Sequence, residues 1–122
     1  MSFTEAVKSV ITQYAVFSGR ARRSEYWYYF LFECAVNFVL SFAGNITDMN
    51  IFNVLISIFN LALLVPGLAV CFRRMHDTGK SGWWLLIGLI PVIGQILIMI
   101  WFIKDSEPGP NQYGPNPKGE YI

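Results

Sequence analysis

The sequence has few charged residues, and this shortage excludes most soluble folds. Charged residues make up 14% of its 122 positions, whereas about a quarter is typical of a soluble domain. Apolar residues make up 54%, and a chain this small buries too little of its surface to hide them all from water. The composition therefore predicts a membrane protein with room for a single domain, residues 1–122.

Cysteine is equally scarce. The two cysteines, Cys34 and Cys71, lie inside or at the edge of apolar segments, where they are small hydrophobic side chains rather than a disulfide framework. No CxxC or Cys/His cluster indicates a metal, and no cofactor is expected. A secretory signal peptide is not indicated, because about 25 residues precede the first apolar run and no small-residue cleavage site follows it.

Long apolar segments are present at 26–43, 51–72 and 83–103. Each holds about 18 to 22 residues, enough to cross a hydrocarbon core of about 30 Å as a helix. Pro91 interrupts the third segment. We prefer a kinked spanning helix there, because membrane helices tolerate proline when the freed carbonyl finds a partner. The alternative is a re-entrant hairpin turning at Pro91, which would return the tail to the cytoplasm.

The segments outside these spans are more polar. Residues 3–17 place apolar side chains at spacings of three and four, which predicts an amphipathic helix lying in the membrane interface or, alternatively, packed on the protein. Residues 104–122 are rich in Pro, Gly and Asn, which predicts an irregular tail. The expected fold class is all-α: an integral membrane protein with three transmembrane helices, an N-terminal interfacial helix and an irregular tail.

The basic residues predict the orientation. Seven of the nine precede the first span or lie between the second and third spans, and none lies between the first and second. The positive-inside rule then places the N-terminus and the 73–82 loop in the cytoplasm. Aromatic residues would form a belt at the interfaces, with Trp27, Tyr28, Tyr29, Trp83 and Trp84 on the cytoplasmic side and Trp101 on the opposite side.

The polar side chains inside the spans include Glu33, Asn37, Asn60 and Gln95, and Asn53 and Ser57 share one helix face with Asn60. Glu33 is ionisable, and such a residue in a span is a functional candidate because its burial is costly. At about 1.5 Å per residue, the amides of Asn37, Asn60 and Gln95 lie roughly 16 to 18 Å deep and would meet near the midplane. They form either a polar path for a proton or small solute or hydrogen bonds between helices. We prefer the second interpretation, because three helices do not easily enclose a pore.

Two short motifs suggest chemistry but have the wrong context. Gly79-Lys80-Ser81 has no glycine five positions earlier and no preceding strand, so it is not a phosphate-binding loop. His76-Asp77 has no evident nucleophile beside it, so acid–base catalysis is not expected. We therefore expect no enzyme activity and interpret the 73–82 loop as a turn between two spans.

Charged residues flank the spans on the predicted cytoplasmic side, and we call them the collar. Their cations are expected to contact anionic lipid headgroups and are too few to indicate nucleic acid binding. Asp77 is expected to pair with Arg22 or Arg23. Glu25 is expected to pair with Arg73 or Arg74. The collar comprises Arg20, Arg22, Arg23, Glu25, Arg73, Arg74, His76, Asp77 and Lys80.

Three stretches resemble one known family: FSGRARRSEYWYYFLF, FRRMHDTGKSGWW followed by LIPVIG, and NQYGPNPK. It is the family of small bacterial inner-membrane proteins of the YhaH/YhaI type, catalogued as domain of unknown function 805. The resemblance spans nearly the whole chain and implies a location in the inner membrane, without an established activity or substrate. The signature positions correspond to Gly19, Arg20, Arg22, Arg23, Glu25, Tyr26, Trp27, Arg73, Arg74, His76, Asp77, Gly79, Ser81, Trp83, Tyr113, Gly114, Asn116 and Pro117.

The function expected from these features is non-enzymatic. The protein would be a scaffold, or a partner- or lipid-binding membrane protein, whose collar contacts anionic lipid and a protein partner or second copy of the chain. The alternative is a subunit of an oligomeric channel or transporter that uses Glu33 and the mid-membrane amides. An enzyme acting on a lipid headgroup at the collar ranks third.

Overall fold

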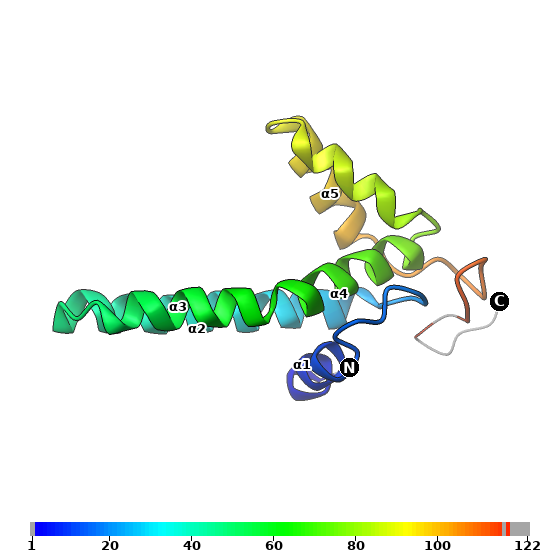
Figure 1. Cartoon of the computed structure of the whole chain (residues 1–122). Helices are drawn as coiled ribbons and strands as arrows, with labels where there is room; N and C mark the ends of the chain where they lie inside the picture. The colour runs from blue at the N-terminus through cyan, green and yellow to red at the C-terminus, as the bar shows by residue number, and fades with distance from the viewer. Residues whose placement is uncertain (1, 116, 118–122) are drawn as a thin grey trace.

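The structure is a computed structural model that describes residues 2–115 and 117 (Figure 1). These residues form helices and no strand, with one isolated bridge between Asn111 and Gly114. The all-α prediction is confirmed for this part of the chain. The elements in order are α1 (Phe3–Thr12), α2 (Arg23–Thr47), α3 (Ile51–Ala62), α4 (Leu64–Asp77), the 3-10 helix η1 (Gly82–Leu89) and α5 (Ile93–Ile103).

The longest helix is α2, which extends beyond the expected 26–43 at both ends. By length and composition it can cross a membrane, and within the described residues the pair α3–α4 is a second such segment if its halves count as one span. α2 stops where Asp48 adopts a left-handed φ of 54°, a conformation that aspartate tolerates better than most residues. α3 then returns along α2 (Figure 1), which brings Phe52 against Gly44.

The segment expected as one span over 51–72 is bent. α3 and α4 meet at Leu63 and enclose a bend of 42°. Pro66 explains the bend, because it has no N–H for the preceding turn and its ring presses on that turn's carbonyl. The Leu63 carbonyl accepts from the Gly67 N–H at 2.9 Å and from the Tyr29 hydroxyl at 3.3 Å. The bend is therefore fastened to α2.

The third apolar segment is a hairpin, so the kinked spanning helix expected over 83–103 is not formed. The chain reverses between η1 and α5 at Pro91 and Val92, where Val92 has a φ of 65°. Pro91 cannot donate the hydrogen bond that would continue a helix, and the positive φ turns the chain back. The reversal at Pro91 that we weighed as the alternative is the arrangement in the structure.

The two arms of the hairpin are in close contact. Trp84 and Trp101 meet edge to face with ring centroids 6.0 Å apart. Gly94 lies directly against the Ile87 carbonyl, in a space that no side chain could share. We had expected Trp101 at the opposite interface. Because the arms are antiparallel, it instead returns to the level of Trp84. The Lys80 ammonium group lies 5.1 Å from the Trp101 ring centroid.

Both ends of the hairpin lie at the end of α4, and Figure 1 shows the hairpin and the α2–α3 pair diverging from there. Gly82, at the start of η1, packs on the Phe72 ring. At the end of α5, the Phe102 carbonyl accepts from Trp27 Nε1 at 2.9 Å. The tail that follows α5 therefore begins at the end of the molecule where α2 begins.

Helix α1 is shorter than the expected 3–17. It ends at Thr12, whose hydroxyl donates to a carbonyl one turn back and so competes with the helical N–H groups. Its buried face packs into a small core formed by Val10, Ala21, Tyr29 and Val70. The N-terminal helix is therefore packed on the protein along one face.

Candidate functional site: a buried charged joint

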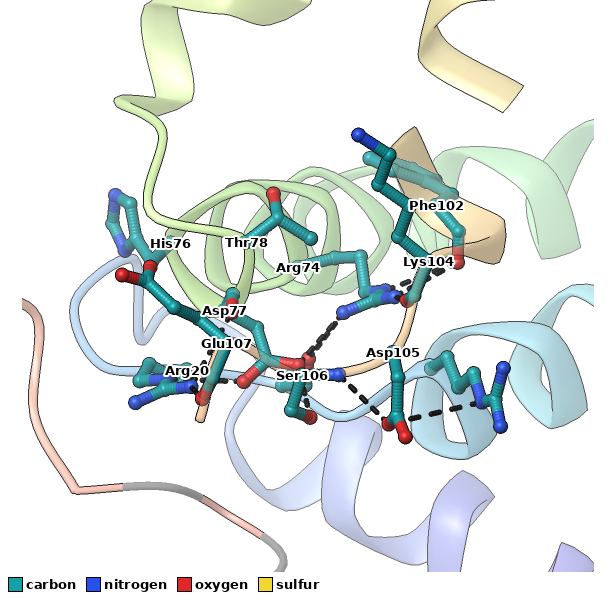
Figure 2. A network of polar contacts seen from close by, with 12 residues as sticks. Arg20, Arg74, His76, Asp77, Thr78, Phe102, Lys104, Asp105, Ser106 and Glu107 are labelled. Atoms are coloured by element: carbon teal, nitrogen blue, oxygen red, sulfur yellow. Dashed lines mark hydrogen bonds and ion pairs between the residues drawn. The ribbon is translucent and has the colours of Figure 1, made fainter. Parts of the chain in front are cut away.

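Charged and polar side chains from the N-terminal segment, α2, α4 and the tail converge at the end of α4. Figure 2 shows those around Asp77. We call this cluster the charged joint. Its members are buried, although charged residues are rarely fully buried unless they are paired. The joint comprises Arg20, Glu25, Arg73, Arg74, His76, Asp77 and Ser106.

Asp77 is at the centre of the joint. Its Oδ1 accepts from Arg20 Nε at 3.0 Å, and its Oδ2 accepts from Arg74 Nη1 at 2.7 Å and from the Ser106 hydroxyl at 2.5 Å. Burial raises the pKa of Asp77, and these three partners oppose the rise. The two guanidinium groups that face the carboxylate favour its ionised form. Asp77 thus meets the condition for burying a charge, because both of its oxygens have charged partners or donors.

Arg20 connects the joint to the tail. Besides Asp77, its guanidinium donates to the carbonyls of Glu107 at 2.6 Å, Gly109 at 2.8 Å and Gly114 at 3.3 Å. Figure 2 shows the Arg20 and Glu107 positions on facing segments of the chain. One side chain therefore holds an irregular segment in place by its backbone, without requiring particular tail side chains.

Arg74 connects the joint to the end of α5. Its Nη2 donates to the Phe102 carbonyl at 3.0 Å and also to the Lys104 carbonyl. The last carbonyls of a helix have no partner within that helix, so a buried guanidinium is a suitable donor for them. This contact fixes the returning arm of the hairpin against α4.

Arg73 connects α1, α2 and α4. Its Nη1 donates to Glu25 Oε2 at 2.7 Å and to Gln13 Oε1 at 2.8 Å. The side chains of Arg73 and Glu25 are 2% and 6% exposed, so this pair is shielded from solvent screening. The remaining Nε and Nη2 of Arg73 have no hydrogen-bond partner among residues 2–115 and 117.

His76 lies at the edge of the joint and contacts the tail. Its ring stacks on Tyr113 with centroids 4.0 Å apart and planes 6° from parallel. Its Nδ1 lies 2.9 Å from the Gly19 carbonyl, and its own carbonyl accepts from Asn111 Nδ2 at 2.9 Å. Burial lowers the pKa of His76, against the opposing effect of the Gly19 carbonyl. A neutral imidazole therefore fits this setting.

The pairing expected for Asp77 with Arg22 or Arg23 was wrong, because Arg20 and Arg74 occupy the carboxylate. Arg23 begins α2 and its Nε lies 3.9 Å from Asp105, with both side chains about half exposed. Such an exposed pair contributes little to stability.

The expected contact of the collar cations with lipid headgroups does not hold for three of them. Arg20, Arg73 and Arg74 are internal, and their hydrogen bonds go to protein groups. The collar cations with accessible surface are Arg22, Arg23 and Lys80. Glu25 pairs with Arg73, one of the two partners expected for it.

The tail residues of the joint were missed by reasoning from the residues alone. Ser106 lies in a polar, Pro- and Gly-rich stretch that carries no periodic signal, and the carbonyls that bind Arg20 carry no sequence signal at all. The signature positions Tyr113 and Gly114 were the available indication that the tail belongs to the joint. The signature residue Asn116 lies outside the described residues.

The Gly79-Lys80-Ser81 motif forms the turn between α4 and η1, as we expected. Gly79 has a φ of 81°, which reverses the chain after α4 and which glycine adopts freely. The Ser81 hydroxyl accepts from the Trp83 N–H at 3.4 Å and caps η1. Glu107 lies directly against Gly79, so the turn is in contact with the tail.

Of the three amides expected to meet between the helices, two do. Asn37 and Asn60 exchange side-chain hydrogen bonds of 3.2 Å in both directions. Gln95 is exposed on α5, near the turn of the hairpin that diverges from α2 and α3 (Figure 1). Glu33 lies one turn from Asn37 on α2 and faces α4, where its Oε1 would be 3.9 Å from a Cβ placed on Gly67.

The chemistry available at the joint is pairing and positioning. Residues 2–115 and 117 contain no group of His, Cys, Asp and Glu side chains arranged to hold a metal ion. Every Asp77 oxygen is occupied by a donor, and the carboxylate is inaccessible to a substrate. The joint therefore fastens the N-terminal segment, α2, α4, α5 and the tail to one another.

These features define an all-helical, apolar chain with a helix long enough to cross a membrane and a charged joint at one end. The chain belongs to the family described as "Protein of unknown function (DUF805)", which matches residues 14–115.

Among its relatives are two proteins of Escherichia coli (strain K12). The chain is 39% identical to "Inner membrane protein YhaH" over 114 residues, which are 91% of this chain and 94% of that protein. It is 37% identical to "Inner membrane protein YhaI" over 110 residues, 90% of this chain and 92% of that protein. No solved structure matches the chain significantly.

Proposed function

We propose that this is a non-enzymatic, multi-pass protein of the bacterial inner membrane that presents a docking platform on the cytoplasmic face. The platform consists of the turn 78–81 and the tail 104–115, and its ligands are anionic lipid headgroups and a protein partner. The inner-membrane location rests on the names of the relatives, which are similar over nearly their whole length.

The observation that carries this proposal is the charged joint. Arg20 and Arg74 donate to backbone carbonyls of the tail and of the end of α5, so an otherwise irregular segment is held in one conformation. Ordering a flexible segment costs conformational entropy. A fixed platform at a membrane surface is useful to a protein that binds something there.

The topology we propose has α2 and the bent pair α3–α4 as spans, with the η1–α5 hairpin re-entrant. The N-terminus, the turn 78–81 and the tail then lie on one side of the membrane. Basic residues concentrate on that side, which the positive-inside rule assigns to the cytoplasm. Cations with accessible surface there are Lys8, Arg22, Arg23, Lys80 and Lys104, and each contributes about 1 kcal/mol to binding an anionic surface.

Lipid retention tests this proposal. The full chain is purified in nanodiscs of mixed anionic and zwitterionic lipid, released into mild detergent, and the lipid that stays bound is identified by mass spectrometry. We expect enrichment of anionic lipid, reduced by the triple variant Arg22→Gln, Arg23→Gln, Lys80→Gln. Asp48→Asn, at the opposite end of α2, is the control for a charge lost away from this face. Equal retention of both lipids, together with no protein captured by cross-linking in native membranes, would refute the platform.

The second candidate function is a channel or transporter subunit. The Asn37–Asn60 pair and the nearby Glu33 favour it, whereas the position of Gln95 breaks the path that we expected within one chain. This function requires several copies to complete a path. Solute or proton flux into liposomes that depends on Glu33, lost in Glu33→Gln without loss of folded protein, would support it over the platform.

A further inference from the structure

Glu33 faces a cavity between α2 and α4, at the level of the bend in the α3–α4 pair. The cavity has a volume of about 290 Å³, which is at the lower end for small-molecule sites. Its lining combines apolar side chains with a few polar groups from α2 and α3. The lining residues used below are Tyr26, Tyr29, Phe30, Glu33, Asn60 and Gly67.

The bend and a glycine create this space. Pro66 tilts α4 away from the line of α3, and Gly67 has no side chain to fill the gap that results. A Cβ on Gly67 would lie 3.7 Å from the Tyr29 hydroxyl and 3.9 Å from Glu33 Oε1. The cavity therefore has a phenol and a carboxyl group on one wall and bare backbone on the other.

Glu33 forms no ion pair with any residue among 2–115 and 117. The nearest cluster of cations is the charged joint, where Arg73 is paired with Glu25 and Arg74 with Asp77. A carboxylate in an apolar segment is stable only with a compensating charge or complete hydrogen bonding. The Tyr29 hydroxyl is a hydrogen-bond partner of Glu33, but its single proton is shared with the Leu63 carbonyl, which lies 3.3 Å away.

The aromatic wall of the cavity suits a positive charge. The rings of Tyr26 and Phe30 stack with centroids 6.2 Å apart and planes 20° from parallel, and the faces of such rings attract cations. At the rim, Phe30, Leu64 and Leu68 are 45%, 56% and 45% exposed. In the proposed topology this rim faces the bilayer, so a ligand enters from the lipid and must itself be lipophilic.

We propose that this cavity is a binding site for a small lipophilic cation, such as an aromatic amine or quaternary ammonium compound. The Glu33 carboxylate neutralises the positive head, and the rings of Tyr26 and Phe30 contact it and its apolar part. This site is separate from the platform and from the joint. It remains whether or not the platform binds lipid or a protein.

The probe for this site is benzyltrimethylammonium, which carries one ring and one fixed positive charge. It is titrated calorimetrically into the full chain in nanodiscs, with protein-free nanodiscs as the blank. We expect saturable binding with one molecule per chain. Neopentylbenzene has the same shape without the charge. We expect it to bind at least about tenfold more weakly, because it cannot form the charge interaction with the Glu33 carboxylate.

Two variants test the named contacts. Glu33→Gln keeps the shape and removes the charge, so the affinity for the cation should fall about tenfold or more. Gly67→Ala keeps Glu33 and puts a methyl group into the cavity, so binding should weaken several-fold. Asp48→Asn removes a carboxylate at the far end of α2, outside this cavity, and should leave the affinity unchanged.

Three results would overturn the proposal: no saturable binding by the unaltered chain, unchanged affinity in Glu33→Gln, or equal binding of neopentylbenzene. The last result would show an apolar pocket without charge selectivity. If Glu33→Gln lacks a cooperative unfolding transition, the comparison of the two probes on the unaltered chain and on Gly67→Ala decides the question.

Discussion

Arg20 and Asp77 are 57 positions apart in the chain, and they form an ion pair whose side chains are 1% and 0% exposed. Arg20 Nε lies 3.0 Å from Asp77 Oδ1. With Arg74 on the other carboxylate oxygen, the pair joins the segment before α2 to the end of α4. Removing one member of such a pair leaves an uncompensated buried charge, which costs more than the pair gains by forming.

Asp77→Asn should therefore lower the free energy of unfolding by about 3 to 5 kcal/mol, because it leaves both guanidinium groups without their carboxylate. Ser106→Ala removes only one hydroxyl donor from the same carboxylate and should cost about 1 kcal/mol. Denaturant unfolding in detergent micelles, followed by tryptophan fluorescence, measures both. The critical result is which variant loses more free energy of unfolding. Equal losses would mean that the Asp77 charge does not stabilise the joint.

Reversing the charges of Glu25 and Arg73 tests the second buried pair. Each single reversal, Glu25→Arg or Arg73→Glu, places like charges within the joint and should lower the melting temperature strongly. The double variant restores opposite charges and should recover part of the loss. The matched control is Glu25→Arg with Arg74→Glu, which should show no recovery because Arg74 pairs with Asp77. Recovery in both double variants would point to net charge rather than to this contact.

Acidification should loosen the contact of His76 with the tail. Burial lowers the pKa of His76 below its ordinary value of 6.5. As the pH falls below 6.5, His76 of the unfolded chain takes up a proton before His76 of the folded chain. The contribution of neutral His76 to the free energy of unfolding is therefore complete above that pH and decreases below it. Melting temperatures between pH 8 and pH 5 measure this loss. His76→Gln removes the titrating group and should flatten the curve; the same slope in this variant would assign the effect to other groups.

Gly94→Ala should open the hairpin, because the added methyl group would collide with the backbone carbonyl of Ile87. Gly88→Ala is the matched control, since its methyl group would meet only the end of the Ile98 side chain, at 2.9 Å, and that side chain can rotate away. The melting temperature and the rate of proteolysis after α5 should change markedly in the first variant and little in the second. Comparable stability of the two variants would contradict the close packing of the arms.

Reporter fusions determine the side on which the tail lies. In the hairpin topology, a fluorescent protein fused after residue 122 folds in the cytoplasm and shines, and a periplasm-dependent phosphatase at the same site stays inactive. A third span would give the opposite pair of results. A phosphatase inserted after Asp48 should be active, because the α2–α3 turn lies on the other side of the membrane.

Composition and charge were sufficient to predict the all-α fold and the regions of the helices. The end of α2 and the turn at Gly79 follow from local signals that the sequence contains. The bend at Leu63 follows from Pro66, although we treated 51–72 as one segment. The hairpin depends on Val92 adopting a positive φ and on Gly94 meeting a backbone carbonyl, and neither is visible in hydropathy.

The site was less predictable than the fold. Charge sign alone indicated that the arginines and acidic residues at the span ends would pair, but it did not distinguish Arg20 from Arg22 and Arg23 for Asp77. That choice depends on the direction of the chain before α2, where the Ala21 N–H donates to the Arg73 carbonyl at 2.9 Å. The tail acceptors are backbone carbonyls, which every residue has.

The order of synthesis gives the joint a further consequence. Arg20, Arg74 and Asp77 leave the ribosome well before the carbonyls of Phe102, Glu107 and Gly109 that complete their hydrogen bonds. Until those residues emerge, Arg20 and Arg74 can pair with Asp77, but the N–H groups that bind those carbonyls have only water as an acceptor. Completion of the joint therefore requires the segment that follows α5, and a chain truncated before Phe102 is expected to lack these acceptors.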